Sequence, residues 1–185
     1  MTKAQLTVLA GPTAVGKGTV VAALTKRFPT LNVSISATTR GPRPGELNGV
    51  HYYFVSTQEF DAMIERGDML EWALVHGKNK YGTPRGPVDE ALAAGKPVLL
   101  EIDLAGARQV RTNRPDAQFI FLAPPSWEEL ERRLIGRGTE SPEEQARRLA
   151  TARVELDAAS EFDHVVINDD VDRAVSELAG LIGLE

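Results

Sequence analysis

The sequence has 185 residues and no cysteine, which excludes disulfide bonds and any metal site built on thiolates. It also has no apolar stretch that approaches the length of a membrane span, and its first residues lack the basic segment and long apolar run of a secretory signal. We therefore expect a cytoplasmic protein that has no membrane partner. Its length is that of one α/β domain with a single core.

Positive charge is also scarce, because 26 acidic residues outnumber 21 lysines and arginines and leave a net charge of −5. This balance argues against broad binding to nucleic-acid backbones, so we expect no nucleic-acid partner. Any phosphate that the protein binds must be held by local clusters of arginine. The three histidines are scattered without metal-ligand spacing, and no role is assigned to them.

Strand-like and helix-like segments alternate along most of the chain, which is typical of a mainly parallel sheet flanked by helices, an α/β fold. We expect strands near 5–10, 33–37, 97–102, 117–122 and 163–168, and helices near 17–27, 87–94, 104–113, 126–135, 142–158 and 171–183. Two stretches break the alternation, about 40–85 and about 136–149. We interpret the first as an inserted substrate-binding subdomain and the second as a lid, on a core of about 1–39, 86–135 and 150–185.

A glycine-rich segment, GPTAVGKGT, follows the apolar run LTVLA and is the most informative motif of the chain. Its spacing is that of a loop that cradles phosphates between a strand and a helix. Glycines allow the backbone to turn several N–H groups inward, the helix adds its positive end, and Lys17 adds a point charge. The candidate residues are Gly11, Pro12, Thr13, Ala14, Val15, Gly16, Lys17, Gly18 and Thr19. The alternative is a glycine-rich turn with a surface lysine.

Arg40 and Arg43 lie in the segment ATTRGPRPGE, which its glycines and prolines keep out of regular structure. Two arginines three residues apart on a stiff loop can converge on one phosphate, each with a planar fork of donors. Tyr52 and Tyr81 can add hydroxyl donors. The alternative is a pair of solvated arginines on a turn.

Carboxylates follow or interrupt two buried runs. Glu101 and Asp103 end VLLEID, where they share one face of a strand and can hold a nucleotide-bound Mg²⁺ through water. Glu71 interrupts LEWALV and requires a partner if it is buried. Guanine fits, because its N1–H and 2-amino group are adjacent donors, and its O6 can accept from Ser36 or Thr83. The alternative for Glu101 and Asp103 is a carboxylate pair that caps the end of the strand. The alternative for Glu71 is a surface charge at a strand edge.

The segments ERRLIGRGTE and QARRLATAR carry many arginines. Arg133 and Arg137 are four residues apart at a helix end, and Arg148 lies on the next helix across a loop. Such a trio can close over a triphosphate and neutralise charge during transfer. Solvated arginines on amphipathic surface helices are the alternative.

Nine segments, in order GPTAVGKGT, SISATTRGPRPGE, NGVHYYF, LEWA, YGT, EIDLAGA, FLAPPS, LIGRGTE and VIND, make the chain similar to the guanylate kinase family from Leu6 to about Leu184. The resemblance implies a P-loop kinase fold and transfer of phosphate from ATP to GMP, and also to dGMP, with Mg²⁺ as the metal. It implies that Lys17 and its loop hold ATP phosphates, with lid arginines Arg137 and Arg148 and with Arg133 and Asn168 near the ATP base. It implies that Arg40, Arg43, Tyr52 and Tyr81 hold the GMP phosphate, that Ser36, Glu71, Thr83 and Asp103 read guanine, and that Glu101 lies near the metal.

The sequence departs from the family pattern at two places. Gly18 stands where many members have serine, so Thr19 becomes the expected hydroxyl ligand of the metal. The segment GKNKYGT is one residue longer than usual. Two other functions remain open: a kinase of this fold for another small phosphorylated acceptor, and a non-catalytic guanylate-kinase-like module that binds phosphorylated peptides. The sequence predicts no particular protein partner.

Overall fold

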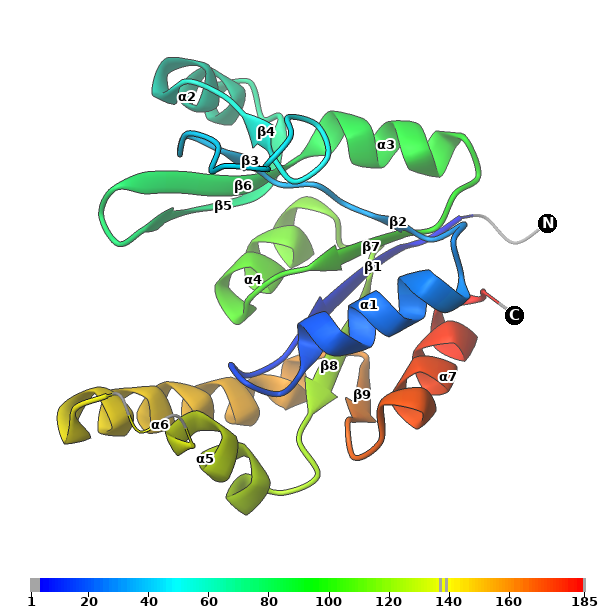
Figure 1. Ribbon diagram of the computed structural model, residues 1–185. Helices are drawn as coiled ribbons and strands as arrows, with labels where there is room; N and C mark the ends of the chain where they lie inside the picture. Colours follow the sequence, from blue (N-terminus) through cyan, green and yellow to red (C-terminus); the bar gives the residue numbers. More distant parts are fainter. Residues whose placement is uncertain (1–3, 137, 139, 185) are drawn as a thin grey trace.

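The structure is a computed structural model that describes residues 4–136, 138 and 140–184 (Figure 1). Its main sheet has five parallel strands in the order β2-β7-β1-β8-β9. Their bounds are β1 Leu6–Ala10, β2 Asn32–Val33, β7 Val98–Glu101, β8 Gln118–Ala123 and β9 His164–Ile167. All five residues of β1 are buried, as expected for a central parallel strand that is covered on both faces.

Helices cover both faces of this sheet (Figure 1). On one face lie α1 (Lys17–Arg27) and α7 (Val171–Ile182), which pack Leu24 and Leu178 against Leu9 and Ile120. On the other face lie α3 (Arg85–Ala93) and α4 (Leu104–Asn113), whose apolar residues form a second cluster with those of β1 and β8. The sheet is therefore the middle layer between two hydrophobic cores, and its strand ends lie at the edge of both.

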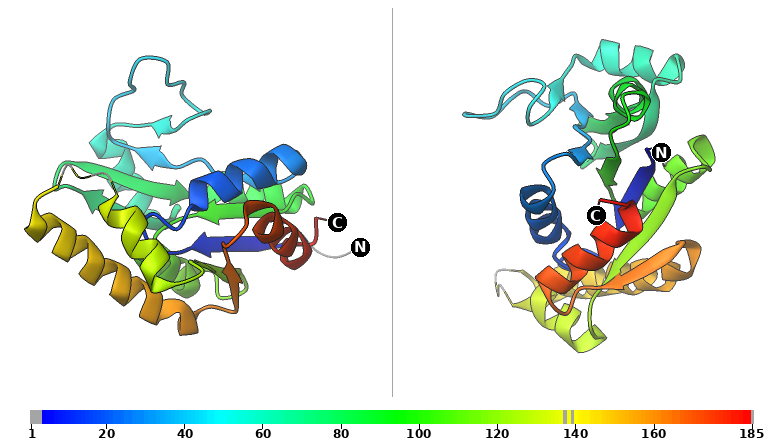
Figure 2. Two further views of the ribbon diagram at one scale, coloured as in Figure 1. Left: turned by 60° about the horizontal axis from the view of Figure 1, so that its bottom comes forward. Right: turned by 90° about the vertical axis from the view of Figure 1, so that its right-hand side faces the viewer.

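A second sheet is built from residues 37–84 in the order β4-β3-β6-β5. Its strands are β3 Ala37–Thr38, β4 Tyr53–Phe54, β5 Met69–Val75 and β6 Asn79–Pro84, and its helix is α2 Thr57–Glu65. Phe60 of α2 is fully buried among Ala37 and Met69, which gives this sheet a core of its own. Both views in Figure 2 show that the loop between β3 and β4 projects away from the rest of the molecule.

Between β8 and β9 the chain forms two further helices, α5 (Trp127–Ile135) and α6 (Pro142–Asp157) (Figure 2). A 3-10 helix, η1 (Ala158–Glu161), follows α6. Helices α5 and α6 pack through Leu130, Leu134 and Ala152. The start of α6 is well defined by its sequence, because Ser141 and Glu144 form a reciprocal capping box. From this start α6 continues as a single helix of 16 residues.

Most of the expected elements are confirmed within one or two residues, including both helices 17–27 and 104–113. The expected strand 33–37 is wrong, because Val33 pairs with β7 of the main sheet whereas Ala37 pairs with β4 and β6 of the second sheet. The sequence analysis also missed β6. No helix within the described residues has both the length and the apolarity that a membrane crossing requires.

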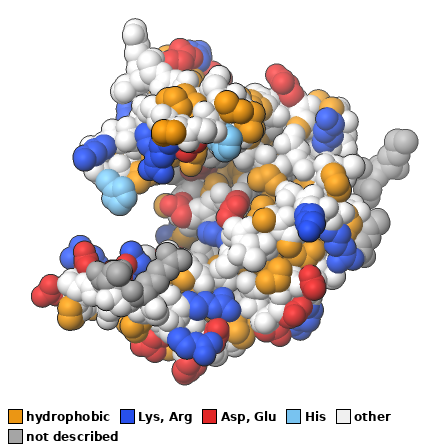
Figure 3. Space-filling model, viewed as in Figure 1, with side chains coloured by type: hydrophobic (Ala, Val, Ile, Leu, Met, Phe, Trp, Pro, Cys, Tyr) orange, Lys and Arg blue, Asp and Glu red, His pale blue; other side chains and the backbone are white. Residues whose placement is uncertain are grey.

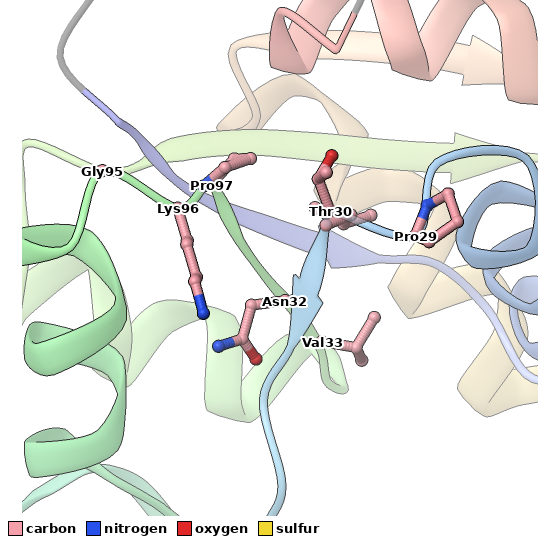
Figure 4. A pocket seen from close by; sticks show the side chains of 8 residues that line it. Pro29, Thr30, Asn32, Val33, Gly95, Lys96 and Pro97 are labelled. Carbon is pink, nitrogen blue, oxygen red and sulfur yellow. The ribbon is translucent and has the colours of Figure 1, made fainter.

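A hollow of about 590 Å³ lies between the residues that precede β7 and the short strand β2. Figure 4 shows that the side chains of Asn32 and Lys96 extend into the same space there. This hollow borders the amino end of β7, whereas ligands of open parallel sheets bind at the carboxyl ends of the strands. It is therefore not the candidate site.

Candidate functional site

The phosphate-binding motif forms the turn between β1 and α1, at the carboxyl end of the central strand. Its glycines are required by close packing, because a Cβ on Gly11 would lie 2.4 Å from the carbonyl oxygen of Leu122. Gly16 has a φ of +95°, and a Cβ there would lie 2.8 Å from Nδ2 of Asn168. A side chain is therefore excluded at Gly11 by packing, and Gly16 adopts a backbone conformation that favours glycine.

Lys17 is the first residue of α1, and its side chain lies across this turn. Its Nζ donates hydrogen bonds to the carbonyl oxygens of Gly11, at 3.2 Å, and Ile102, at 3.3 Å. Burial lowers the pKa of Lys17, and the nearby carboxylates of Glu101, Glu155 and Asp103 act in the opposite direction. The ammonium group is thus held between two strand ends, in a position to meet an anion in the loop.

Two predicted site residues support the outer side of the turn. The Nδ2 of Asn168 donates to the carbonyl oxygen of Val15 at 2.9 Å, and Nη1 of Arg133 donates to the same oxygen at 3.3 Å. Arg133 is in addition paired with Glu129 on its own helix. The structure therefore brings Arg133 and Asn168 together at the loop.

The two carboxylates that follow β7 have different surroundings. Oε1 of Glu101 lies 3.9 Å from the place that a Cβ on Gly18 would occupy, so it is close to the first turn of α1. Asp103 instead caps α4, where its Oδ1 accepts the N–H of Gly106 at 2.7 Å. Thr19 is exposed in the first turn of α1. Glu101 is therefore the better placed of the two carboxylates to meet a cation beside the loop.

The described residues contain no group of three His, Asp or Glu side chains that forms a complete metal site. A Mg²⁺ ion that completes its shell with phosphate oxygens and water needs only one or two protein oxygens. The hard oxygen donors of Glu101 and Thr19 beside the loop fit that requirement.

Glu71 is buried, with 8% of its surface exposed, on β5 opposite Thr83 of β6. Oγ1 of Thr83 donates to Oε1 of Glu71 at 2.7 Å. The pKa of Glu71 is raised, first by burial and further by the charge of Asp103, whereas the Thr83 hydrogen bond acts against this rise. A surface charge at a strand edge is thereby excluded as the interpretation of Glu71.

Space for this carboxylate depends on Gly106 in the first turn of α4. A Cβ there would lie 3.0 Å from Oε2 of Glu71, closer than most neighbours tolerate. The antiparallel pairing of Ala37 with Gly82, continued by one residue, sets Ser36 opposite Thr83. The polar groups expected to read a base therefore converge on one buried carboxylate.

The segment GKNKYGT runs from the turn between β5 and β6 into β6. His76 and Gly77 both have a positive φ in this turn, at 52° and 65°. Beyond the turn, Val75 pairs with Asn79 and Glu71 pairs with Thr83. Glu71 and Thr83 therefore lie opposite each other on neighbouring strands.

Arg40, Tyr52 and Tyr81 form a cluster on the second sheet. Nε of Arg40 donates to the hydroxyl of Tyr81 at 3.2 Å, and its guanidinium carbon lies 5.3 Å from the centre of the Tyr52 ring. The rings of Tyr52 and Tyr81 are 6.0 Å apart. Arg43 is exposed on the projecting loop. The structure therefore joins three of the four residues expected to bind the acceptor phosphate.

Glu46 was not singled out from the sequence, although it ends the motif TTRGPRPGE. Both of its oxygens accept from Arg40, at 3.0 Å each, and Oε2 also accepts the N–H of Arg43 at 2.9 Å. Its pKa is lowered, first by the hydrogen bond from Arg40. Glu46 therefore fixes the direction of the Arg40 side chain and the path of the loop.

Of the two candidate lid arginines, Arg137 and Arg148, the structure describes only Arg148. Arg137 lies outside the described residues. Arg148 is on α6 and forms an ion pair with Glu140. A cavity of about 880 Å³ extends along this helix to the β5–β6 turn, and its lining includes Thr13, His76, Glu140, Glu144 and Arg148. Figure 3 shows the hollow that opens here, with acidic and basic side chains at its floor.

Glu155, also on α6, was missed because nothing in the sequence distinguishes it from the other charges of that helix. Its Oε2 accepts the N–H of Thr13 in the phosphate loop at 3.2 Å. Burial raises the pKa of Glu155, whereas Lys17 and this hydrogen bond lower it. The neighbouring cavity, here called the cleft, is bounded by Thr13 of the phosphate loop, by His76 of the β5–β6 turn and by α6.

Comparisons with known proteins agree on one family. The family model described as guanylate kinase matches residues 3–185. A guanylate kinase of Thermobifida fusca is 61% identical over 96% of this chain and 90% of its own, and one of Leifsonia xyli is 60% identical over 96% of this chain and 70% of its own.

Solved structures support the same relationship. A crystal structure of guanylate kinase from Anaplasma phagocytophilum matches with a TM-score of 0.74 and 30% identity, over 99% of this chain and 86% of the other. A shikimate kinase from Bacteroides thetaiotaomicron matches with a TM-score of 0.51 at 14% identity, over 97% and 98% of the two chains, which shows a shared fold alone.

Proposed function

The chain belongs to the guanylate kinase family and is an enzyme that phosphorylates GMP to GDP at the expense of ATP, and we propose that the cleft described above holds both substrates. The observation that carries the function is the identity of about 60% with curated guanylate kinases over 96% of the chain. The electrostatics support the assignment, because the charge of Asp103 acts both on Lys17 of the phosphate loop and on the buried carboxylate of Glu71.

The ATP phosphates bind in the loop of residues 11–19, where backbone N–H groups, the start of α1 and Lys17 provide positive potential. Arg133 and Asn168 hold the loop through Val15 and border the ATP base. Arg137 and Arg148 belong to the lid and approach the phosphates when it closes. The close packing of Gly11 against Leu122 and of Gly16 against Asn168 supports this assignment, because it fixes the path of the loop at the carboxyl end of β1.

The phosphate of GMP binds to Arg40, Arg43, Tyr52 and Tyr81. Arg40 is already oriented by Glu46, so less side-chain entropy is lost when it binds a phosphate. Guanine binds with its N1–H and 2-amino group on Glu71, and Thr83 and Ser36 border its O6. Asp103 lies beside this pocket and completes its polar rim. We propose that dGMP is accepted as well, because the phosphate and the base assigned to these residues are the same in both nucleotides.

Mg²⁺ is the metal that we assign to the reaction, held by Glu101 and Thr19 in part through water. When bound, it neutralises charge on the transferred phosphoryl group and orients it. The exposed Glu101 oxygen beside Gly18 supports this position.

Catalysis in this cleft needs alignment and charge neutralisation rather than a base. The acceptor oxygen of GMP is already anionic at neutral pH, so no side chain has to remove a proton from it. Lys17, Arg40, Arg137 and Arg148 are the groups that we assign to the neutralisation of developing charge. Exclusion of water by the closed lid prevents transfer to water instead of GMP.

Different parts of the chain are assigned to the two substrates in this proposal. The core (about 1–39, 86–135 and 150–185) binds ATP, the insert (about 40–85) binds GMP, and the lid (about 136–149) covers the phosphates. The separate hydrophobic core around Phe60 supports an insert that moves as a unit. The cytoplasm as the location, and the lack of nucleic-acid and membrane partners, remain predictions.

The test is an assay of ADP release with ATP and a panel of nucleoside monophosphates. We expect turnover with GMP and dGMP, and almost none with AMP, CMP or UMP. Turnover with a different phosphorylated acceptor would indicate another kinase of this fold. Absence of turnover together with binding of a phosphorylated peptide would indicate a non-catalytic module. Either result would overturn the proposal.

A further inference from the structure

Glu155 presents an unusual arrangement, because an acidic side chain points at a loop built to bind anions. Its Oε2 accepts the N–H of Thr13 at 3.2 Å. Its charge also acts on Lys17, the cation of the same loop. A carboxylate has the same sign of charge and the same kind of acceptor oxygens as a phosphate group. It therefore takes up donors that a bound nucleotide would use.

A second carboxylate, Glu140, also pairs with a group that is proposed to bind phosphate. Arg148 of α6 forms its ion pair with Glu140. Arg148 and Glu155 are seven residues apart, which is two turns, so they lie on the same face of α6. Both groups proposed to meet ATP phosphates, the loop and the lid arginine, are thus paired with carboxylates in the structure.

We propose that Glu155 occupies part of the ATP phosphate site when no nucleotide is bound, so that ATP has to displace its carboxylate from the phosphate loop. This inference rests on the proposed position of ATP at residues 11–19. Displacement follows from charge and from hydrogen bonding, since a phosphate and the Glu155 carboxylate beside Thr13 repel each other and compete for one N–H donor. Glu155 is a positioning residue that acts through the loop and through α6.

The arrangement also links the loop to the lid. Arg148 and Glu155 belong to one helix of 16 residues, so a displacement of α6 away from the loop would move both side chains together. ATP phosphates that replace Glu155 at the loop also offer Arg148 an anionic partner in place of Glu140. Without ATP, the carboxylate of Glu155 accepts the N–H of Thr13.

The first test measures ATP binding in the absence of GMP by calorimetry for the unmodified protein, Glu155→Gln and Glu155→Ala. The matched control is Asp157→Asn, which removes one charge from the exposed C-terminal end of the same helix. We expect the ATP dissociation constant to fall about three- to tenfold in both Glu155 variants and to stay unchanged in the control, because a competing charged hydrogen bond is lost. An unchanged or raised dissociation constant in both variants would overturn the inference.

A repeat without Mg²⁺ distinguishes a role toward the metal. The tighter binding is expected with and without Mg²⁺. Weaker binding of ATP by Glu155→Gln only when Mg²⁺ is present would assign Glu155 to the metal and overturn the inference.

The second test compares thermal unfolding without nucleotide and with saturating ATP. We expect saturating ATP to raise the melting temperature of Glu155→Ala more than that of the unmodified protein, because a nucleotide that binds more tightly adds more to the stability of the folded state. An equal rise in both proteins would show that Glu155 does not compete with ATP and would overturn the inference. If Glu155→Ala does not fold, Glu155→Gln serves instead, since it removes the charge and keeps the size of the side chain.

Failure of the inference and failure of the proposed function give different results. An unmodified protein that neither binds ATP nor phosphorylates GMP would overturn both. An active unmodified protein whose Glu155 variants bind ATP with unchanged affinity would overturn the inference alone.

Discussion

Replacement of Glu71 by Gln is expected to damage GMP recognition and to stabilise the empty protein at the same time. The two side chains have nearly the same shape, so Gln accepts the hydrogen bond from Thr83 and fits beside Gly106. What changes is the charge, and with it the number of acceptors that face the guanine edge. The variant thus isolates the chemistry of the carboxylate from its packing.

The functional cost follows from hydrogen-bond counting. Glu71 offers two oxygens to the N1–H and 2-amino donors of guanine, whereas Gln offers one oxygen and sets an N–H₂ donor against a guanine donor. One lost charge-assisted bond and one unpaired buried donor together cost ~3–5 kcal/mol, which corresponds to a fall of ~10² to 10⁴ in kcat/KM for GMP. The preference for GMP over AMP shrinks accordingly.

The effect on stability has the opposite sign. The folded-state pKa of Glu71 is raised above its ordinary value of 4.5, because burial penalises the charged form. The ionised side chain therefore lowers the free energy of unfolding above its folded-state pKa, and this cost disappears once both states are protonated below 4.5. Glu71→Gln should consequently melt higher than the unmodified protein at pH 7, by about 2–4 °C for each kcal/mol relieved, with a difference that shrinks toward pH 4.5.

The measurements are steady-state kinetics with GMP and AMP and thermal unfolding at pH 7 and pH 4.5. Glu65→Gln on the exposed end of α2 is the matched control, and neither its kinetics nor its melting should change appreciably. Unchanged kcat/KM for GMP in Glu71→Gln would refute the base pocket. A lower melting temperature at pH 7 would refute the electrostatic argument.

Further expectations concern the loop, the acceptor phosphate and the first turn of α4. Lys17→Ala should fold normally but lose ~10³-fold in turnover, because charge that develops on the transferred group is left without its cation; near-normal turnover would contradict the assignment. Arg40→Ala should weaken GMP about tenfold or more by calorimetry with little change for ATP, and guanosine should bind the unmodified protein poorly; equal binding of guanosine and GMP would contradict this. Gly106→Ala should raise the KM for GMP about tenfold without affecting that for ATP, since the new methyl group crowds Glu71. The control, Gly180→Ala in α7, has open space around it and should only stabilise the protein, by ~0.5–1 kcal/mol; the same KM for GMP in both variants would contradict the crowding argument.

The secondary structure was largely predictable from the chain because its signals are local. Helix 142–158 has Ser141 and Glu144 at capping-box spacing, and the buried strand at 5–10 is a short apolar run that leads into a glycine-rich turn. Such features depend on residues within one or two turns of each other. The same locality explains the error at 33–37, where one extended segment divides between two sheets according to partners that lie 16 to 66 residues away in the chain.

The candidate site also combines motifs that are contiguous in the sequence with contacts between distant segments. The phosphate loop and the arginine segment are contiguous motifs, so the residue types and spacing in the sequence were sufficient to propose their chemistry. The burial of Glu71, its bond from Thr83 and the room left by Gly106 arise from three elements that the fold brings together. The approach of Glu155 to Thr13 joins residues 142 positions apart. Contacts of this kind depend on how helices and sheets pack, and for that reason only the tertiary structure decided them.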